Sequence, residues 1–111
     1  MVTFTVGSVV LIPFPFSDLS RSKLRPAVVI AEVSHNDWIL CQVTSQAYSD
    51  SQAIEISDDS FQQGLLHRIS YVRPGKLFTA HSTLIRKKVG QLKPDVLKYI
   101  VNKIKLLIDV K

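Results

Sequence analysis

Short apolar runs, rich in β-branched residues and ended by prolines or turn-forming residues, make up most of this chain before Pro94. Runs of this length and composition are typical of β-strands. None approaches the roughly 20 consecutive apolar residues that a membrane-spanning helix needs. The pattern therefore predicts a sheet of short strands, over Ser8–Phe16, Pro26–Val33, Trp38–Thr44, Ala53–Ile56, Ile69–Val72, Lys76–Phe78 and Val89–Leu92.

The segments between these runs carry the polar and turn-forming residues. Ser17–Leu24 is polar and basic, which predicts a surface loop, and Ser34–Asp37 is a turn cluster. Asp58–Leu66 is predicted as a loop with one helical turn, and Pro74-Gly75 as a second turn. Ser82 is a candidate cap for a short helical turn.

The C-terminal segment has a different periodicity. Pro94 suits the first turn of a helix, and Asp95 complements its positive end. Apolar residues then recur at helical spacing and define one face, namely Val96, Leu97, Ile100, Val101, Ile104, Leu107 and Ile108. We therefore predict one amphipathic helix over Pro94–Asp109, packed on the sheet as a structural element. The fold expected is mainly β with a C-terminal helix, built as a small barrel or strongly bent antiparallel sheet.

Length and composition narrow the class of protein further. A chain of 111 residues has room for one domain, 1–111, and its 46% apolar and 21% charged residues argue against disorder. Cys41 is the only cysteine, which excludes an internal disulfide framework, and its apolar strand favours a buried, inert thiol. With three scattered histidines, no zinc site or other cofactor is expected. The N-terminus has no basic start, so we expect a cytoplasmic protein.

Charge is distributed unevenly along the chain, whose net charge is +5. The stretch from Glu32 to Asp59 contains six acids and no Lys or Arg, whereas Ser60 to Pro94 contains seven bases and no acid. Arg21, Lys23 and Arg25 form a further cluster. Clustered cations indicate a phosphate-bearing or otherwise acidic partner, although a solvated basic face remains the alternative.

The usual enzyme signatures are missing, since the chain has no Gly-rich phosphate loop, Gly-x-Ser-x-Gly elbow or His-Glu-x-x-His motif. Two strand ends carry chemistry instead. Arg25 lies where the basic loop meets a strand, and Thr44 ends another. A guanidinium binds two phosphate oxygens and a hydroxyl supplies one more hydrogen bond, so this pair suits a phosphodiester. His67 and His81 lie in the acid-free basic stretch, where a histidine could move protons near neutral pH, although a lone histidine is more often structural.

At these residues the sequence resembles the MazF/PemK family, the toxins of bacterial toxin–antitoxin pairs. The opening strand from Gly7 to Phe16 is similar to the family's, and Arg25-Pro-Ala-Val-Val-Ile is similar to its most specific signature. Further motifs follow in the family's order, namely Gln42-Val-Thr-Ser, Gly64-Leu65, Ser70-Tyr-Val-Arg-Pro-Gly-Lys-Leu-Phe-Thr and Val89-Gly-Gln-Leu. The resemblance covers nearly the whole chain.

The resemblance implies a small SH3-like β-barrel (MazF/PemK/CcdB-like) that forms homodimers. It implies a metal-independent endoribonuclease that cuts single-stranded RNA at short sequences, leaving 2′,3′-cyclic phosphate and 5′-hydroxyl ends. Arg25 and Thr44 match the family's catalytic arginine and threonine, and Arg25 is expected to act electrostatically because its pKa is too high for a base. Candidate RNA contacts are Ser17, Lys23, Ser45, Gln46, Arg68, Ser70, Lys76 and His81.

The resemblance also implies partners. We expect a cognate acidic antitoxin, contact with DNA only through the antitoxin complex, and no membrane association. The loop Ser17–Leu24 resembles the mobile loop that closes over RNA or is blocked by the antitoxin. Two positions depart from the family's pattern, because Ser8 and His81 stand where members usually carry acids.

Two other functions remain open on this sequence. The same barrel occurs in toxins that poison DNA gyrase, which need no Arg–Thr pair, and a degenerate toxin could persist as an RNA- or antitoxin-binding module. The presence of both Arg25 and Thr44 favours the nuclease. Fold alone does not decide between them.

Overall fold

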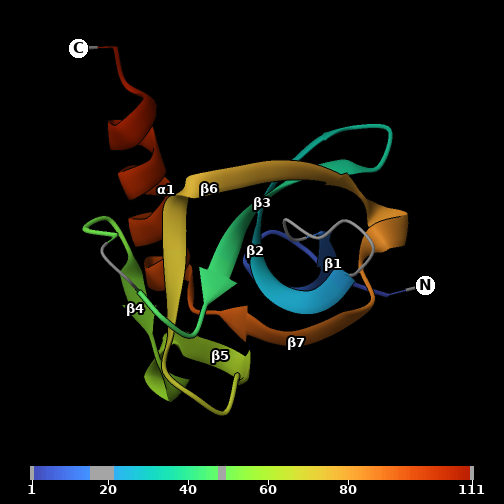
Figure 1. The fold of residues 1–111 in the computed structure, drawn as a ribbon, viewed down its shortest axis with the longest axis horizontal. Helices are drawn as coiled ribbons and strands as arrows, with labels where there is room; N and C mark the ends of the chain where they lie inside the picture. The colour runs from blue at the N-terminus through green and yellow to red at the C-terminus, as the bar shows by residue number, and fades with distance from the viewer. Residues whose placement is uncertain (1, 16–21, 48–49, 111) are drawn as a thin grey trace.

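A single curled antiparallel sheet forms the body of the protein. The computed structural model describes residues 2–15, 22–47 and 50–110. Within them the sheet order is β4-β6-β3-β2-β1-β7-β5, and it curls into a half-barrel (Figure 1). The strands are β1 (Ser8–Pro15), β2 (Ser22–Ser34), β3 (Asp37–Thr44), β4 (Ile54–Ile56), β5 (Phe61–Gly64), β6 (Ser70–His81) and β7 (Lys87–Leu92). The prediction of a mainly β fold with one C-terminal helix is confirmed.

The helix α1 (Pro94–Ile108) begins at the predicted proline and packs against β6. Its Ile100 and Ile104 side chains are buried, as the helical periodicity predicted. Two short 3₁₀ turns complete the elements, η1 (Asp58–Ser60) and η2 (Ser82–Leu84). No helix in the described part of the chain is both long and apolar enough to cross a membrane.

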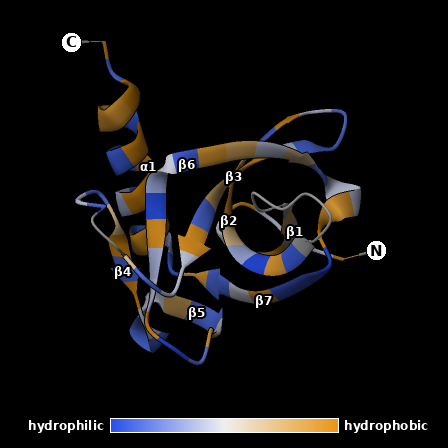
Figure 2. Cartoon of the chain, viewed as in Figure 1, coloured by the Kyte–Doolittle hydropathy of each residue, from blue (hydrophilic) through white to orange (hydrophobic). Residues whose placement is uncertain are grey.

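The sheet has two buried faces, because successive side chains of each strand point to opposite sides. The helix face packs against α1, with Val9, Val28, Cys41, Val43, Ile56, Phe61, Val72 and Leu92 in its core. The opposite face carries a second core of Val10, Ile12, Ala27, Val29, Leu40, Ala80 and Ile85. Figure 2 shows hydrophobic and hydrophilic residues alternating around α1. Burial on both faces explains why the strands read as nearly continuous apolar runs.

Prediction and structure differ most in β6. The predicted turn at Pro74-Gly75 is wrong, because β6 continues through these residues as one strand. The register jumps there, from Val43↔Val72 to Cys41↔Leu77, so the extra residues of β6 form a bulge and the strand bends (Figure 1). Pro74 is buried inside this bend. A proline and a glycine thus mark a bulge rather than a chain reversal.

Three further boundaries differ from the sequence prediction. Ser22–Leu24 belongs to β2 rather than to the loop, because these residues pair with the end of β1. Asp58–Leu66 contains the predicted helical turn, but also the strand β5, which pairs with β7. His81, not Ser82, caps η2, since its ring nitrogen accepts the Thr83 backbone N–H. Residues 16–21 of the predicted strand and loop lie outside the described residues.

Candidate functional site

The register of β1, β2 and β3 places the candidate catalytic residues. Arg25 pairs with Ile12 on β1, and Lys23 pairs with Phe14. Directly opposed residues of an antiparallel pair lie on the same face. Arg25 and Lys23 therefore project from the opposite face of the sheet, beside Ile12 and Phe14, and the half-buried Arg25 stands where the apolar core of that face ends.

Thr44 ends β3 on the same face. The β2–β3 ladder reaches Ala27↔Gln42, and continuing that register by two residues sets Arg25 opposite Thr44. The paired ladder stops next to Pro26, whose nitrogen has no proton to donate. Thr44 is 8% exposed, and its Oγ1 accepts the Gln46 backbone N–H at 3.2 Å. This short-range bond holds the threonine hydroxyl in place and leaves its proton available for donation.

A polar cleft of about 370 Å³ lies beside this pair, between the sheet and the segment that follows β5. It is lined by Leu11, Lys23, Leu24, Arg25, Pro26, Val43, Ser45, Leu66, Arg68 and Ser70. Five of the residues predicted from the sequence therefore come together here, namely Lys23, Arg25, Ser45, Arg68 and Ser70. Lys87, which the sequence analysis did not single out, pairs with Leu11 at the rim.

The segment that carries Arg68 is held by backbone conformation. Gly64 and His67 both have positive φ, 75° and 66°, and reverse the chain between β5 and β6. Ser70 is buried, and its hydroxyl donates to the Arg68 carbonyl at 3.3 Å. In this structure the Ser70 hydroxyl thus positions the Arg68 backbone within the cleft.

Not every candidate residue lies in the cleft. The side chain of Gln46 is exposed just beyond Thr44. Lys76 lines a different pocket, described next, and His81 pairs with Asp37 at the far end of the β3–β6 ladder from the Thr44↔Tyr71 pair. Ser17 lies outside the described residues. The structure therefore does not bring His81 to the Arg25–Thr44 pair.

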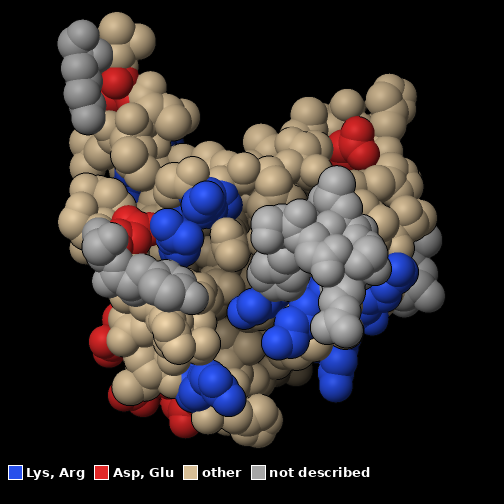
Figure 3. Space-filling model, in the orientation of Figure 1, with Lys and Arg blue, Asp and Glu red and all other residues tan. Residues whose placement is uncertain are grey.

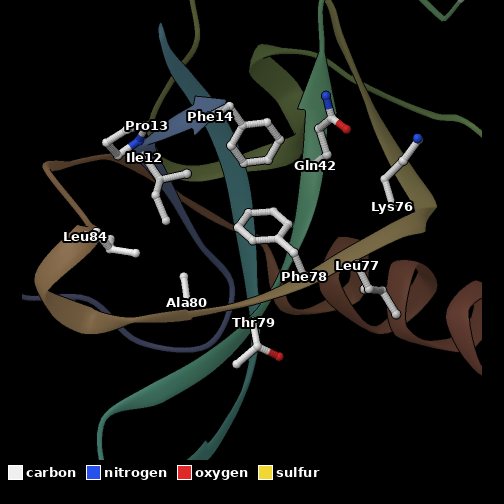
Figure 4. Close-up of a pocket in the computed structure, with 10 residues that line it drawn as sticks. All are labelled: Ile12, Pro13, Phe14, Gln42, Lys76, Leu77, Phe78, Thr79, Ala80 and Leu84. Atoms are coloured by element: carbon white, nitrogen blue, oxygen red, sulfur yellow. The ribbon is translucent and has the colours of Figure 1, made fainter. Parts of the chain in front are cut away.

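An aromatic pocket of about 380 Å³ adjoins the pair on the opposite face, and the sequence analysis missed it (Figure 4). Its lining comprises Ile12, Pro13, Phe14, Gln42, Lys76, Leu77, Phe78, Thr79, Ala80 and Leu84. Phe14 and Phe78 meet edge to face, with ring centroids 4.7 Å apart. Gln42 precedes Thr44 by two residues and therefore lies on the same face of β3. The alternation of side chains along β3 and β6 was the sequence signal for this pocket. The β6 bulge, which the sequence does not reveal, determines which β6 residues face Gln42.

Electrostatics favour an anionic ligand on the face shown in Figure 3, where Lys and Arg side chains spread across the middle and acidic side chains lie toward the margins. Among the described residues, one ion pair forms, between Arg73 and Asp50 at 2.8 Å. Hydrogen bonding from the Arg73 guanidinium lowers the pKa of Asp50 below 3.8. No described carboxylate forms an ion pair with Lys23 or Arg68, which line the cleft.

Two further side chains have structural roles. Burial raises the pKa of the Cys41 thiol to about 12, and its Sγ donates to the Arg73 carbonyl at 2.9 Å. Cys41 is therefore the inert core thiol that its apolar strand predicted. Ser8 is buried, accepts the Thr5 N–H and donates to Gln91, each at 2.9 Å. Within the described residues, no three His, Cys, Asp or Glu side chains gather where they could hold a metal ion.

This arrangement can bind and polarise a phosphodiester. A guanidinium and a hydroxyl on adjacent strands converge from one face, and four further cationic or hydroxyl-bearing residues line the cleft beside them. The guanidinium supplies planar, paired donors to two phosphate oxygens. Preorganised donors of this kind stabilise the charge that develops on a phosphorus under attack.

Comparison with known proteins identifies relatives of this fold. The model of the family described as "PemK-like, MazF-like toxin of type II toxin-antitoxin system" matches residues 5–108. No curated protein matches the sequence.

Solved structures with the same fold are distant in sequence. A crystal structure of MazE–MazF from Deinococcus radiodurans has a TM-score of 0.74 at 17% identity and covers 96% of both chains. Mycobacterium tuberculosis toxin MazF-mt6 has a TM-score of 0.71 at 13% identity, covering 94% of this chain and 98% of that one. A mycobacterial endoribonuclease in complex with its cognate antitoxin has a TM-score of 0.68 at 13% identity, covering 96% and 93%.

Proposed function

The chain belongs to the PemK-like and MazF-like toxins of type II toxin–antitoxin systems, and we propose that it is an endoribonuclease that cleaves single-stranded RNA at short sequences. The observation that carries this proposal is the juxtaposition of Arg25 and Thr44 on one face of the sheet, beside a cleft that also holds Lys23 and Arg68. A gyrase poison or a simple binding module has no need of this pair.

The reaction proposed is an internal transfer at phosphorus. The ribose 2′-oxygen attacks the adjacent phosphorus, the bond to the 5′-oxygen breaks, and a 2′,3′-cyclic phosphate and a 5′-hydroxyl result. The 2′-hydroxyl proton leaves to solvent or a base, and the departing 5′-oxygen takes up a proton. No metal ion takes part in this scheme. The protein's task is to place the phosphate and to stabilise the extra negative charge of the pentacoordinate state.

Arg25 and Thr44 divide that task. A guanidinium stays protonated at all ordinary pH values, so Arg25 neutralises charge on the phosphorane rather than accepting a proton. The Thr44 hydroxyl, held by the Gln46 N–H, donates to another phosphate oxygen. Lys23 and Arg68 bind neighbouring phosphates and fix the register of the RNA in the cleft.

The same basic cleft also accommodates an acidic antitoxin. Two of the similar solved structures are complexes of a toxin with its antitoxin. We propose that an acidic segment of a cognate antitoxin neutralises Lys23, Arg25 and Arg68 and thereby blocks RNA, that the toxin acts as a homodimer in the cytoplasm, and that it meets DNA only through the antitoxin complex.

The test is incubation of the purified, antitoxin-free protein with a long RNA of defined sequence in EDTA, followed by mapping of the ends produced. We expect discrete cuts at a recurring short sequence, with cyclic-phosphate and 5′-hydroxyl ends. Arg25→Ala should lower kcat by roughly 10²-fold or more, the cost of losing one preorganised charge donor. Arg25→Lys keeps the charge but not the paired donors, and should rescue only part of that loss.

Two controls make the result specific. Lys105→Ala removes one positive charge from the exposed last turn of α1, and should leave kcat unchanged. Thr44→Ala should resemble Arg25→Ala in kcat while retaining the wild-type circular dichroism. Intact RNA from folded wild-type protein, on substrates that contain all short sequences, would contradict the nuclease assignment and favour the gyrase-poison or binding-module alternatives.

A further inference from the structure

The aromatic pocket adjoins the proposed catalytic pair along two strands. Ile12, in the pocket wall, is the direct cross-strand partner of Arg25. Gln42, also in the wall, precedes Thr44 by two residues on the same face of β3, which corresponds to about 7 Å along the strand. A nucleotide whose phosphate lies between Arg25 and Thr44 therefore has this pocket within reach of one neighbouring base.

The pocket combines an apolar body with a polar end. Figure 4 shows the Phe14 and Phe78 rings in its middle, Leu84 and Ala80 toward one side, and the Gln42 amide with the Lys76 side chain at the other. Because Phe14 and Phe78 meet edge to face, at an interplanar angle of 81°, they do not cover each other's faces as a stacked pair would. An open aromatic face is a stacking platform for a base.

Gln42 is the one side chain of the lining that presents both a donor and an acceptor on a planar group. It is half-buried, and its amide has no hydrogen-bond partner within the described part of the chain. A glutamine amide forms two parallel hydrogen bonds with adenine, accepting from its N6 amino group and donating to the adjacent ring nitrogen. Lys76 is exposed at the same end, where a backbone phosphate of the bound strand would complement its charge.

We propose that the aromatic pocket is a nucleobase site of this enzyme, in which an adenine next to the scissile phosphate stacks on the Phe14–Phe78 pair and is selected by the Gln42 amide. The inference rests on the proposed function and deepens it, because it assigns part of the sequence preference to named residues. A nucleobase pairs with the Gln42 amide at the polar end of the pocket, whereas a purely apolar side chain of a protein partner would leave that amide unpaired.

The experiment uses RNA oligonucleotides that contain one mapped cut site and differ at single positions on either side of it. For the wild-type protein we expect kcat/KM to favour adenine at one of these positions by roughly 5- to 150-fold, the range for a good bidentate contact. Gln42→Ala should remove that preference. Gln42→Glu leaves only acceptors, and should shift the preference toward guanine, whose Watson–Crick edge presents two neighbouring donors.

Stacking is tested separately from selection. Phe78→Leu should lower kcat/KM for all four bases at that position by a similar factor, because every base offers a ring face. Gln62→Glu is the matched control, since it makes the same change on the exposed part of β5, away from the pocket, and should keep the wild-type preference. Melting curves verify that each variant is folded.

The failures are distinguishable. Wild-type protein that cuts RNA, with a base preference unchanged in both Gln42 variants, overturns this inference and leaves the proposed function standing. Wild-type protein that cuts no RNA overturns both. If the Gln42 and Phe78 variants weaken antitoxin binding but retain the base preference, the pocket belongs to the protein partner and the inference is wrong.

Discussion

Gly64 is the position where one added methyl group should do most damage, and the effect can be worked out from the structure. Its φ of +75° lies in the left-handed region, which costs an L-residue about 1–2 kcal/mol. An added Cβ would lie 2.2 Å from the Val89 carbonyl oxygen and 2.7 Å from the Gly90 Cα, both backbone atoms that no rotamer change can move. Relieving such a clash requires a backbone shift, which costs about 1–3 kcal/mol more.

Gly64→Ala should therefore destabilise the fold by about 2–5 kcal/mol. At roughly 4 °C per kcal/mol for a domain of this size, the melting temperature should fall by about 8–20 °C. Because Gly64 pairs with Gly90 and precedes the segment that carries Arg68, the shift should also disturb the polar cleft. RNA cleavage below the melting transition should show a higher KM than the wild-type enzyme.

Gly75→Ala is the matched control for this experiment. Its added Cβ would meet no heavy atom within 4 Å, and its backbone is not left-handed. The same change should be neutral or stabilise the protein by about 0.4–1 kcal/mol, through the reduced freedom of the unfolded chain. Thermal melting by circular dichroism, at one protein concentration because self-association shifts the midpoint, measures both. A Gly64→Ala protein that melts within about 2 °C of wild type would refute the reasoning.

Three further predictions use other contacts. The pKa of Asp50 lies below its ordinary 3.8, so the Arg73–Asp50 pair contributes its full stabilisation above pH 3.8 and loses it as the pH falls through the lower pKa of the folded protein. Asp50→Asn removes this contribution, so the free energy of unfolding of the variant should change less with pH below 3.8 than that of the wild-type protein. The Cys41 thiol, buried with a pKa of about 12, should resist alkylation near neutral pH until the protein unfolds, and fast labelling of the native protein would contradict its burial. If Lys23 and Arg68 bind phosphates, Lys23→Gln or Arg68→Gln should each reduce the slope of log affinity for single-stranded RNA against log salt by about 0.7, and an unchanged slope would place that side chain off the RNA.

The β2–β3 hairpin shows how far the sequence could predict the site. The turn at His35–Asn36 was readable from its composition, and both residues have the positive φ of a tight hairpin turn. A regular ladder from the Ser34↔Asp37 pair, however, would set Arg25 opposite Gln46. Two register shifts along the hairpin move the pairing by two residues, and only then does the continued register set Thr44 opposite Arg25. Bulges depend on packing across the whole sheet, so local patterns do not reveal them.

The candidate residues separate for a similar reason. The sequence analysis predicted both Ser70 and His81 as RNA contacts, but the two residues lie at opposite ends of β6. Because β6 has no turn at Pro74-Gly75, its two halves extend along the sheet instead of folding back together. The chemistry of Arg25 and Thr44 could be inferred from residue type and family resemblance, whereas the neighbours of that pair depended on register.

Successive side chains of β2 between Lys23 and Pro26 point to opposite faces of the sheet, so this short stretch adjoins both the aromatic pocket and the polar cleft. Lys23 and Arg25 project from the opposite face, next to the aromatic pocket, whereas Leu24 and Pro26 face the helix side, where Ser45 and Ser70 line the polar cleft. A phosphate at Arg25 is therefore reachable from both sides of the strand, with a stacking surface on one and cations and hydroxyls on the other. Pro26 contributes to this arrangement, because the paired β2–β3 ladder ends beside it, before Arg25 and Thr44. Replacing Pro26 with valine would restore a backbone donor, and if that donor extends the ladder, the variant should be as stable as wild type yet cleave RNA more slowly.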